Sequence, residues 1–310
     1  MTFENKHTVA FHLTRKLKEM DIPVEGWLEF VRSRNNDAFS DHAKVFCKVL
    51  PPNYGRANIR RELQFTNEFG NQIPLFTPLH DQLIEFHAAG AIRYATAWKW
   101  EPNIIPATLD TLDENIVQTM AEQLTVIHRL PKREWMPHLT HDALDYTINK
   151  RISYGRENGA SEEHIQLLDK LFTQLLPATK FNFMDTVPNH GDCHAKNFIK
   201  AGEGYRWTDF ESIRLAPREW DMANLSLMTR RLAGKNELWD IIHEVFDAEK
   251  KVEDELVHLF EIMKAISTSS YMLMHPMSQH IFKERVEALE PLLTGGDFPV
   301  RFPAYSSTLP

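Results

Sequence analysis

Three side chains in the second half of the sequence have the types and spacing of a phosphoryl-transfer site. Asn197 follows Asp192 by five residues, and Asp209 follows it by seventeen. In such a site one carboxylate orients the attacking hydroxyl and accepts its proton. An amide oxygen and a second carboxylate are ligands that suit Mg²⁺ on nucleotide phosphates. We therefore expect Asp192 to be the catalytic base, with Asn197 and Asp209 as metal ligands.

Two other residue types beside Asp192 suggest different chemistry. His190 and His194 are four residues apart, a spacing that helical zinc sites use, but Gly191 between them favours a turn. We expect both histidines to support the loop through hydrogen bonds, with zinc binding as the alternative. Cys193 is either a reactive thiol or a small buried side chain, and no neighbour clearly favours the thiolate.

The composition is that of a globular protein large enough for one or two domains. The chain has 310 residues, of which 43% are hydrophobic and 25% charged. Its net charge of -8 disfavours a nucleic-acid partner, since such binding depends on neutralising phosphates with Lys and Arg. Two cysteines are too few for a disulfide framework.

Neither a targeting signal nor a membrane-spanning segment is evident in the sequence. The first residues have no apolar signal-peptide core, and no run of eighteen apolar residues occurs anywhere. We therefore expect a cytoplasmic protein with no membrane partner. The sequence does not indicate an oligomeric state.

Strand-like runs are concentrated in the first third of the chain. We expect strands over 26–31 and 43–50 and two more within 84–100, with helices over 6–20 and 56–69. Residues 101–103 then break the pattern and are interpreted as a hinge between two lobes. After the hinge we expect mainly helices, with short strands on either side of Asp192 and Asp209, the helical segments being 112–130, 161–176 and much of 220–293.

The motifs around these residues are similar to those of the aminoglycoside phosphotransferase and choline kinase superfamily. The similarity is specific over 187–225 and compatible elsewhere, and the matching motifs are His190-Gly191-Asp192-x-His194-x-x-Asn197, Asp209-Phe210-Glu211 and Pro217-x-x-Trp220-Asp221-Met222-Ala223. The resemblance implies a bilobal, protein-kinase-like α+β fold. It places a small, β-rich nucleotide-binding lobe at 1–101 and a larger, mostly helical lobe for catalysis and acceptor binding at 102–310.

The same resemblance implies roles for individual residues. Asp192 would be the base, Asn197 and Asp209 would bind Mg²⁺, and Asp221 would brace the catalytic loop. His194 stands where protein kinases usually carry a lysine, which favours a small-molecule kinase over a protein kinase.

The nucleotide-binding lobe should supply a phosphate-binding lysine on a strand and a glutamate on the next helix. Lys48 fits the lysine position, with Lys44 as the alternative, and Glu62 fits the glutamate position, with Glu68 as the alternative. Trp98 and Trp100 are candidates to line an adenine pocket near the hinge, although aromatic residues in strands often only pack.

The loop before Lys48 departs from the family pattern. Residues 33–40 contain no glycine, whereas the family usually covers the phosphates with a small, often Gly-rich loop. Asn can adopt the left-handed backbone conformation that Gly usually supplies, and Ser hydroxyls can bind phosphate. A catalytically weak nucleotide-binding or regulatory module is therefore the alternative to an active enzyme.

We expect a phosphotransferase that depends on ATP and Mg²⁺, GTP not being excluded, and that acts on the hydroxyl of a small molecule. Acids and aromatic rings of the C-terminal helices could bind an amine-bearing acceptor such as an aminoglycoside, choline or thiamine. The residues concerned are Glu244, Asp247, Glu249, Glu261, Trp239, Phe246, Phe260 and Tyr271. A neutral sugar or a hydroxy amino acid stays open.

Overall fold

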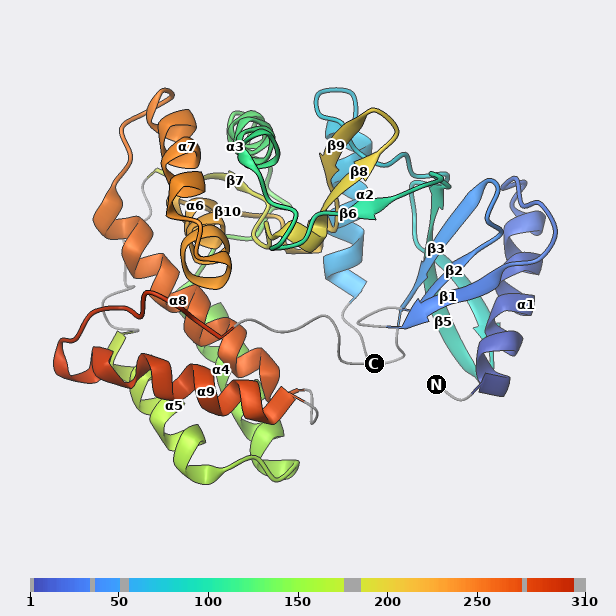
Figure 1. Ribbon diagram of the computed structural model, residues 1–310. Coiled ribbons are helices and arrows are strands. Elements are labelled where there is room, and N and C mark those ends of the chain that lie inside the picture. The colour runs from blue at the N-terminus through green and yellow to red at the C-terminus, as the bar shows by residue number, and fades with distance from the viewer. Residues whose placement is uncertain (1–2, 34–36, 51–55, 176–184, 275–277, 304–310) are drawn as a thin grey trace. The chain divides into compact units, whose positions relative to one another are not determined.

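A computed structural model describes residues 3–33, 37–50, 56–175, 185–274 and 278–303 (Figure 1). The chain divides into two compact units. The first comprises Met1–Ala107 and Lys196–Ile213, and the second comprises Thr108–Ala195 and Arg214–Pro310. The functional division expected after residue 101 stays a prediction. Within the described residues, every helix is too short or too polar to cross a membrane.

The first unit contains a five-stranded antiparallel sheet with the order β1-β2-β3-β5-β4. Its strands are β1 (Glu29–Ser33), β2 (Asp37–Ser40), β3 (Val45–Val49), β4 (Ile84–Ala88) and β5 (Ala91–Lys99). The strands predicted over 43–50 and 84–100 are confirmed, and the first predicted strand begins and ends later than expected. The α+β class is confirmed.

The loop predicted over 33–40 is wrong in part, because residues 37–40 form β2. Asp and Ser are poor strand residues, but β2 pairs antiparallel with both β1 and β3, and its four side chains are buried. Pairing on both sides overrides local preference here. The rest of the glycine-free segment, residues 34–36, lies outside the described residues.

Two helices cover opposite faces of this sheet, α1 (Phe3–Glu19) and α2 (Arg56–Phe69) (Figure 1). Along β3, Val45, Cys47 and Val49 are buried in one hydrophobic core with apolar side chains of α1. Because side chains alternate across a strand, Lys48 points to the other face, where α2 carries Glu62. This alternation explains why a lysine is found between apolar residues in the sequence of β3.

A second, three-stranded sheet of the first unit is formed by β6 (Ile105–Pro106), β8 (Phe198–Ala201) and β9 (Gly204–Trp207). Phe198 of β8 pairs with Trp207 of β9. The residues that flank this pair therefore meet at one end of the hairpin, where the Thr208 amide donates to the Asn197 carbonyl oxygen at 2.9 Å. In this way the hairpin brings Asn197 next to the segment that carries Asp209.

The second unit is mainly helical, as expected. Its helices are α3 (Glu114–His128), α4 (His141–Glu157), α5 (Glu162–Leu175), α6 (Glu219–Ser226), α7 (Asn236–Asp247), α8 (Asp254–Met272) and α9 (Gln279–Leu289). A π-helical stretch, Leu227–Ala233, continues α6. The sequence-based prediction missed α4, although Thr140 caps its N-terminus by accepting from the Ala143 amide.

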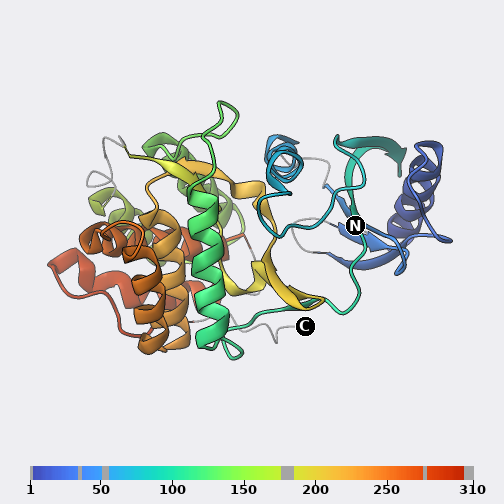
Figure 2. The same cartoon turned by 90° about the horizontal axis from the view of Figure 1, so that it is seen from above.

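Apolar side chains from α4, α5, α6, α8 and α9 form one hydrophobic cluster, and α3 packs beside α7 (Figure 2). The only sheet that the described part of this unit contains pairs β7 (Val187–Asn189) with β10 (Arg214–Ala216). The loop with Asp192 follows β7, and α6 follows β10, so this short sheet sets the starting points of both.

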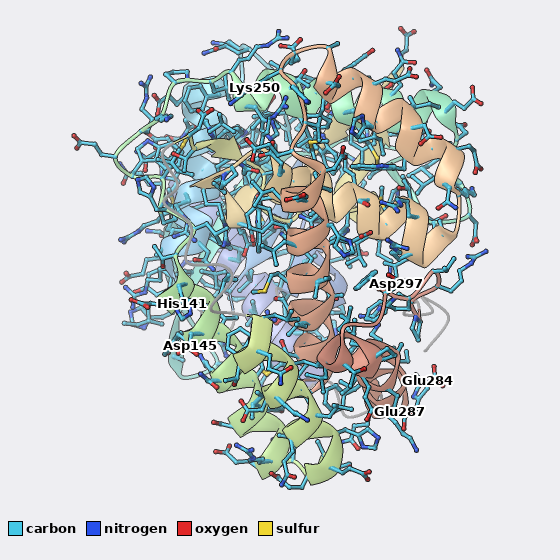
Figure 3. The ribbon with its side chains drawn as sticks, turned by 90° about the vertical axis from the view of Figure 1, so that its left-hand side faces the viewer. His141, Asp145, Lys250, Glu284, Glu287 and Asp297 are labelled. Carbon is cyan, nitrogen blue, oxygen red and sulfur yellow. The ribbon has the colours of Figure 1, made fainter. Side chains whose placement is uncertain are left out.

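The start of α6 is fixed by Arg218, a buried residue. Its guanidinium donates to the carbonyl oxygens of Phe246, at 2.9 Å, and of Lys250 and Lys251 in the connection from α7 to α8. Lys250 marks that connection at the top of Figure 3. Three residues after Arg218, α6 carries Asp221, so this anchor also holds the acid predicted to brace the catalytic loop.

Candidate active site

Asp221 holds the loop that follows β7. Its carboxylate is fully buried and accepts from the backbone amides of His190, at 2.8 Å, and Gly191, at 2.9 Å. His128 of α3 donates from Nε2 to the same carboxylate at 3.1 Å. Burial alone would raise the pKa of Asp221, but the hydrogen bond from His128, the charges of His128 and His190 and the Gly191 amide lower it to about 2. The acid is therefore ionised and fully bonded.

The backbone of the loop is shaped so that two successive amides reach this acid. Gly191 has a φ of 83°, a left-handed conformation that costs a residue with a Cβ about 1–2 kcal/mol. The amide of Asp192 then donates to Nδ1 of His190 at 3.3 Å. His190 is buried, so it lies beneath the loop and supports it.

Asp192 itself points toward solvent. Its side chain is 52% exposed, and Nε2 of His194 lies 3.7 Å from its Oδ2. An accessible carboxylate on a braced loop has the placement that a general base needs. Asp192 belongs to the second unit, whereas Asn197 and Asp209 belong to the first.

Cys193 is a buried side chain rather than an accessible thiol. Its Sγ donates to the Asp221 carbonyl oxygen at 3.3 Å, and the Asn224 side chain donates to Sγ at 3.5 Å. Burial raises the pKa of the Cys193 thiol well above its usual value, which the nearby Asp221 charge reinforces. The structure therefore favours the buried-side-chain interpretation.

A buried cation of α8 also contacts this loop. Lys264 donates from Nζ to the Gly191 carbonyl oxygen at 2.9 Å, and the same nitrogen lies 3.8 Å from the ring centroid of Trp220. Burial lowers the pKa of Lys264 to about 8, and the charge of Arg214 adds to that effect. The sequence reasoning missed Lys264, because nothing in a helical stretch shows which lysine turns inward.

In the first unit, Lys48, Glu62 and Asp209 form a contiguous charged cluster. Nζ of Lys48 donates to both carboxylate oxygens of Glu62, at 2.9 and 3.0 Å, and to Oδ1 of Asp209 at 3.2 Å. The side chain of Glu62 is 4% exposed and that of Lys48 is 16% exposed, whereas that of Asp209 is 41% exposed. The cluster is therefore buried at Glu62 and accessible to solvent at Asp209.

The charges in this cluster stabilise one another. Burial would lower the pKa of Lys48, but the carboxylates of Asp209, Glu62 and Glu211 outweigh it and raise that pKa above its usual value. Lys48 is therefore charged at neutral pH. A cation held in this way is suited to contact phosphate oxygens.

Asp209 sits at the start of a tight turn that α2 holds in place. The residue has φ 67° and ψ 53°, a left-handed conformation that Asp tolerates better than most residues. The ring of the next residue, Phe210, stacks on Phe65 of α2 with centroids 4.5 Å apart. Arg61 of α2 donates to the Glu211 carbonyl oxygen at 3.2 Å. Packing against α2 thus fixes where the Asp209 carboxylate points.

Glu211 is a candidate ligand that the sequence reasoning quoted in a motif but gave no role. One oxygen from each of Glu62, Asp209 and Glu211 lies within 4.8 Å of the others, and Oε1 of Glu211 is 3.9 Å from Lys48 Nζ. The signal in the sequence was a second acid two positions after Asp209. Clustered carboxylate oxygens next to the Asn197 segment form the hard-oxygen donor set that fits Mg²⁺.

The alternatives to Lys48 and Glu62 lie elsewhere in the first unit. Lys44 is half-exposed and pairs with Glu25 at 2.6 Å. Glu68 is an exposed residue of α2. The structure therefore brings Lys48 and Glu62 together with Asp209, and their functional roles stay predictions.

The two tryptophans proposed for a nucleotide pocket differ in their surroundings. Trp98 of β5 is buried, its Nε1 donates to Oγ1 of Thr96 at 2.8 Å, and its ring centroid lies 5.9 Å from Lys48 Nζ. Trp100 follows the strand and meets the ring of His42 edge-on at 5.5 Å. Trp98 thus shares the sheet face of Lys48, while its role in nucleotide binding stays a prediction.

Most of the acids and rings proposed for a cationic acceptor already have internal partners. Glu261 is fully buried, accepts from Ser226 at 2.9 Å and pairs with Arg231 at 3.1 Å. Phe246 and Phe260 are buried in the interior. Of the rings proposed for acceptor binding, Tyr271 is half-buried.

The comparisons with known proteins show the family and the fold of the chain. Residues 29–248, more than half of the chain, match the phosphotransferase enzyme family. No curated protein matches the sequence.

Among solved structures, the chain is similar to a spectinomycin phosphotransferase in complex with ADP and spectinomycin, at 14% identity and a TM-score of 0.63 over 88% of this chain and 96% of that one. It is also similar to an amicoumacin kinase in complex with AMP-PNP, Ca²⁺ and amicoumacin, at 10% identity and a TM-score of 0.68 over 92% and 96%. A choline kinase from Streptococcus pneumoniae matches at 15% identity and a TM-score of 0.61 over 93% of each chain. At these identities the structures show the kinase-like fold alone, and together with the sequence match they lead to one conclusion: the chain belongs to the phosphotransferase enzyme family.

Proposed function

We propose that this protein transfers the γ-phosphate of ATP to a hydroxyl group of a small molecule in a Mg²⁺-dependent reaction, with GTP as the alternative donor. The observation that carries the proposal is the contact of Lys48 with both Glu62 and Asp209, at 2.9 and 3.2 Å. A lysine that contacts a glutamate and an aspartate is the combination of residue types that kinase-like folds use for phosphoryl transfer, which supports the proposal.

In this proposal Lys48 binds phosphate oxygens of the nucleotide, and Glu62 keeps its ammonium in place. Asn197, Asp209 and Glu211 would hold Mg²⁺, whose charge supports binding of the phosphates and stabilises the charge that develops on them. The left-handed turn at Asp209 and the stacking of Phe210 on Phe65 hold the Asp209 carboxylate ready for this task.

Asp192 would orient the acceptor hydroxyl and take its proton as the new bond to phosphorus forms. A positioned general base typically contributes about 10²- to 10⁴-fold in rate. Asp221, His190 and Lys264 do not take part in this transfer, but they hold the backbone from which Asp192 projects.

The experiment that tests the proposal measures nucleotide binding and turnover separately. Thermal unfolding is followed with millimolar ATP or GTP, with and without Mg²⁺, and ADP release is then measured over a panel of alcohols that includes aminoglycosides, choline, thiamine and neutral sugars. We expect a Mg²⁺-dependent rise in melting temperature and ADP release that depends on one class of alcohol. A melting temperature unmoved by any nucleotide would contradict the proposal. Binding without turnover would favour the catalytically weak module.

A further inference from the structure

Arg151 of α4 is a partly buried guanidinium held against α8. Its Nη1 donates to the carbonyl oxygen of Ser267 at 2.8 Å, to Oγ of Ser267 at 3.3 Å and to Oγ of Ser270 at 3.1 Å. Its Cζ lies 5.4 Å from the ring centroid of Tyr271. These three hydrogen bonds use one nitrogen and end on neutral oxygens, so the rest of the planar donor fork is left for another group.

Among the side chains that the structure describes, no acid forms an ion pair with Arg151, and the acid whose charge acts on it from further away is Asp192. Burial lowers the pKa of Arg151, and the more distant Tyr271 and Asp192 offset that effect only in part. A guanidinium taken partly out of water with only a distant counter-charge is costly. An anionic ligand would supply the missing charge.

The register of α8 connects Arg151 to the catalytic loop. Lys264, Ser267 and Tyr271 are spaced at i, i+3 and i+7, so they share one face of the helix. Lys264 contacts the Gly191 carbonyl oxygen next to Asp192, whereas Ser267 and Tyr271 contact Arg151. Three residues correspond to a rise of about 4.5 Å along a helix, so the α8 residue that contacts Arg151 lies about one helical turn from the α8 residue that contacts the loop.

Beyond the buried Lys264, several side chains at or near this face are accessible. Arg151, Ser267, Tyr271 and His194 are partly exposed, and Asp192 is exposed. A small molecule could therefore contact the Arg151 fork while its hydroxyl lies at Asp192. The positive charge near the base disfavours an amine at this position, in contrast to the acceptor predicted from the acids of the C-terminal helices.

We propose that Arg151 is a specificity-determining residue that binds an anionic group of the acceptor, either a carboxylate or a phosphate. Both groups match the planar guanidinium with two parallel hydrogen bonds. The proposal rests on the proposed kinase function and names the class of its substrate, an alcohol that carries negative charge.

The test uses four related probes that differ in charge, namely gluconate, glucose 6-phosphate, glucose and glucosamine. ADP release is measured for the wild type, Arg151→Gln and Arg151→Lys. The control is Arg285→Gln, which alters another buried arginine that donates to a backbone carbonyl, that of Pro303 at 2.7 Å. Thermal unfolding with Mg-ADP and each anion gives a binding readout that does not depend on turnover.

We expect the wild type to prefer gluconate or glucose 6-phosphate at least tenfold over glucose and glucosamine, and the preferred one of the two identifies the anion. Arg151→Gln should lower kcat/KM for that anion about 10- to 100-fold and leave glucose unaffected, whereas Arg151→Lys should restore part of the loss. Arg285→Gln should lower stability without changing the preference.

Several results would overturn the inference. One is a wild-type preference for glucosamine or glucose, and another is an equal loss for all four probes in Arg151→Gln. A third is that neither anion raises the melting temperature of the wild type, or that an anion raises the melting temperature of Arg151→Gln as much as that of the wild type. A protein that binds no nucleotide at all would refute the kinase function itself, which distinguishes the two failures.

Discussion

The ammonium of Lys264 donates to the carbonyl oxygen of Gly191 at 2.9 Å, directly before Asp192 in the chain. On its other side Asp221 accepts the Gly191 amide at 2.9 Å. A buried cation and a buried carboxylate therefore hold the two ends of one residue whose φ is 83°. The position of Asp192 depends on both contacts.

Comparison with Lys264→Met should show that alkaline pH has opposite effects on the stability and the activity of the wild type. The pKa of Lys264 falls from 10.5 to about 8 on folding, so between these values the unfolded chain binds the proton more strongly. Wild-type stability should therefore rise with pH across that window, by up to about 3 kcal/mol relative to Lys264→Met. Over the same window kcat/KM of the wild type should fall, as the charged contact to Gly191 is lost.

Urea unfolding and steady-state kinetics between pH 7 and 10.5 check this prediction. The other titratable or charged groups around Lys264 are Cys193, Asp192, Asp221 and Arg214, and they are present in both proteins. Differences between the two pH profiles therefore report on Lys264. Parallel stability profiles would show that its pKa is not lowered.

Asp221→Asn should destabilise the loop and change the acid stability of the protein. The carboxylate accepts two amides and His128, and an amide side chain cannot accept all of them, so we expect a loss of about 2–4 kcal/mol at pH 7. The pKa of Asp221 is lowered from 3.8 to about 2. Its contribution to folding stability is therefore complete above pH 3.8 and is lost as the pH falls toward 2. The variant should lack that acid-dependent loss, on the order of 2 kcal/mol.

Asp254→Asn provides the matched control for this measurement. Asp254 also pairs with a histidine, His243, at 3.0 Å, but its side chain is 74% exposed. An exposed pair contributes only about 0–1 kcal/mol. Equal effects of the two substitutions on urea unfolding would show that the buried position of Asp221 has no special importance.

Lys48→Met should weaken nucleotide binding, and Lys44→Met should not. Removing the Lys48 ammonium leaves Glu62 and Asp209 without the cation that contacts both. We expect kcat/KM for ATP to fall about 10²- to 10³-fold, the loss typical of a charge-stabilising donor. Lys44 pairs with Glu25 at a half-exposed site. Equal losses in both variants would remove the assignment of Lys48 as the phosphate-binding lysine.

Asp209→Asn and Glu211→Gln should each lower the affinity for Mg²⁺ in the presence of ADP, Asp209→Asn more strongly. Both changes keep the size of the side chain, and Asn tolerates the left-handed backbone at Asp209, so the fold should survive. Calorimetric titration of Mg²⁺ measures the effect. The control is Asp142→Asn, because the Asp142 side chain is fully exposed. Unchanged Mg²⁺ affinity in both variants would exclude these residues as ligands.

The sequence predicted the α+β class and most helices, because the 3.6-residue periodicity of α2, α3 and α5 is clear. It did not reveal β2, where Asp37, Ala38 and Ser40 have low strand propensity and pairing on both sides holds the strand. It also missed α4, whose amphipathic pattern is weaker than those of α2, α3 and α5.

For the site, motif spacing selected Asp192, Asn197 and Asp209 as candidates, and the family resemblance added Asp221. It could not select Arg151 or Lys264, because their contacts depend on which face of a helix they occupy and on what packs there. Arginines and lysines at helical spacing usually lie on solvated faces, so only tertiary contacts distinguish these two.

The most direct test of the account is ADP release by Asp192→Asn with the alcohol that the wild type uses. The variant keeps the shape of the side chain but cannot accept the hydroxyl proton. The Asp221 contacts to His190 and Gly191 should remain, so Mg-ADP should raise the melting temperature as in the wild type. We predict a kcat lower by about 10²- to 10⁴-fold with this stabilisation retained. Wild-type turnover in Asp192→Asn would contradict the central claim.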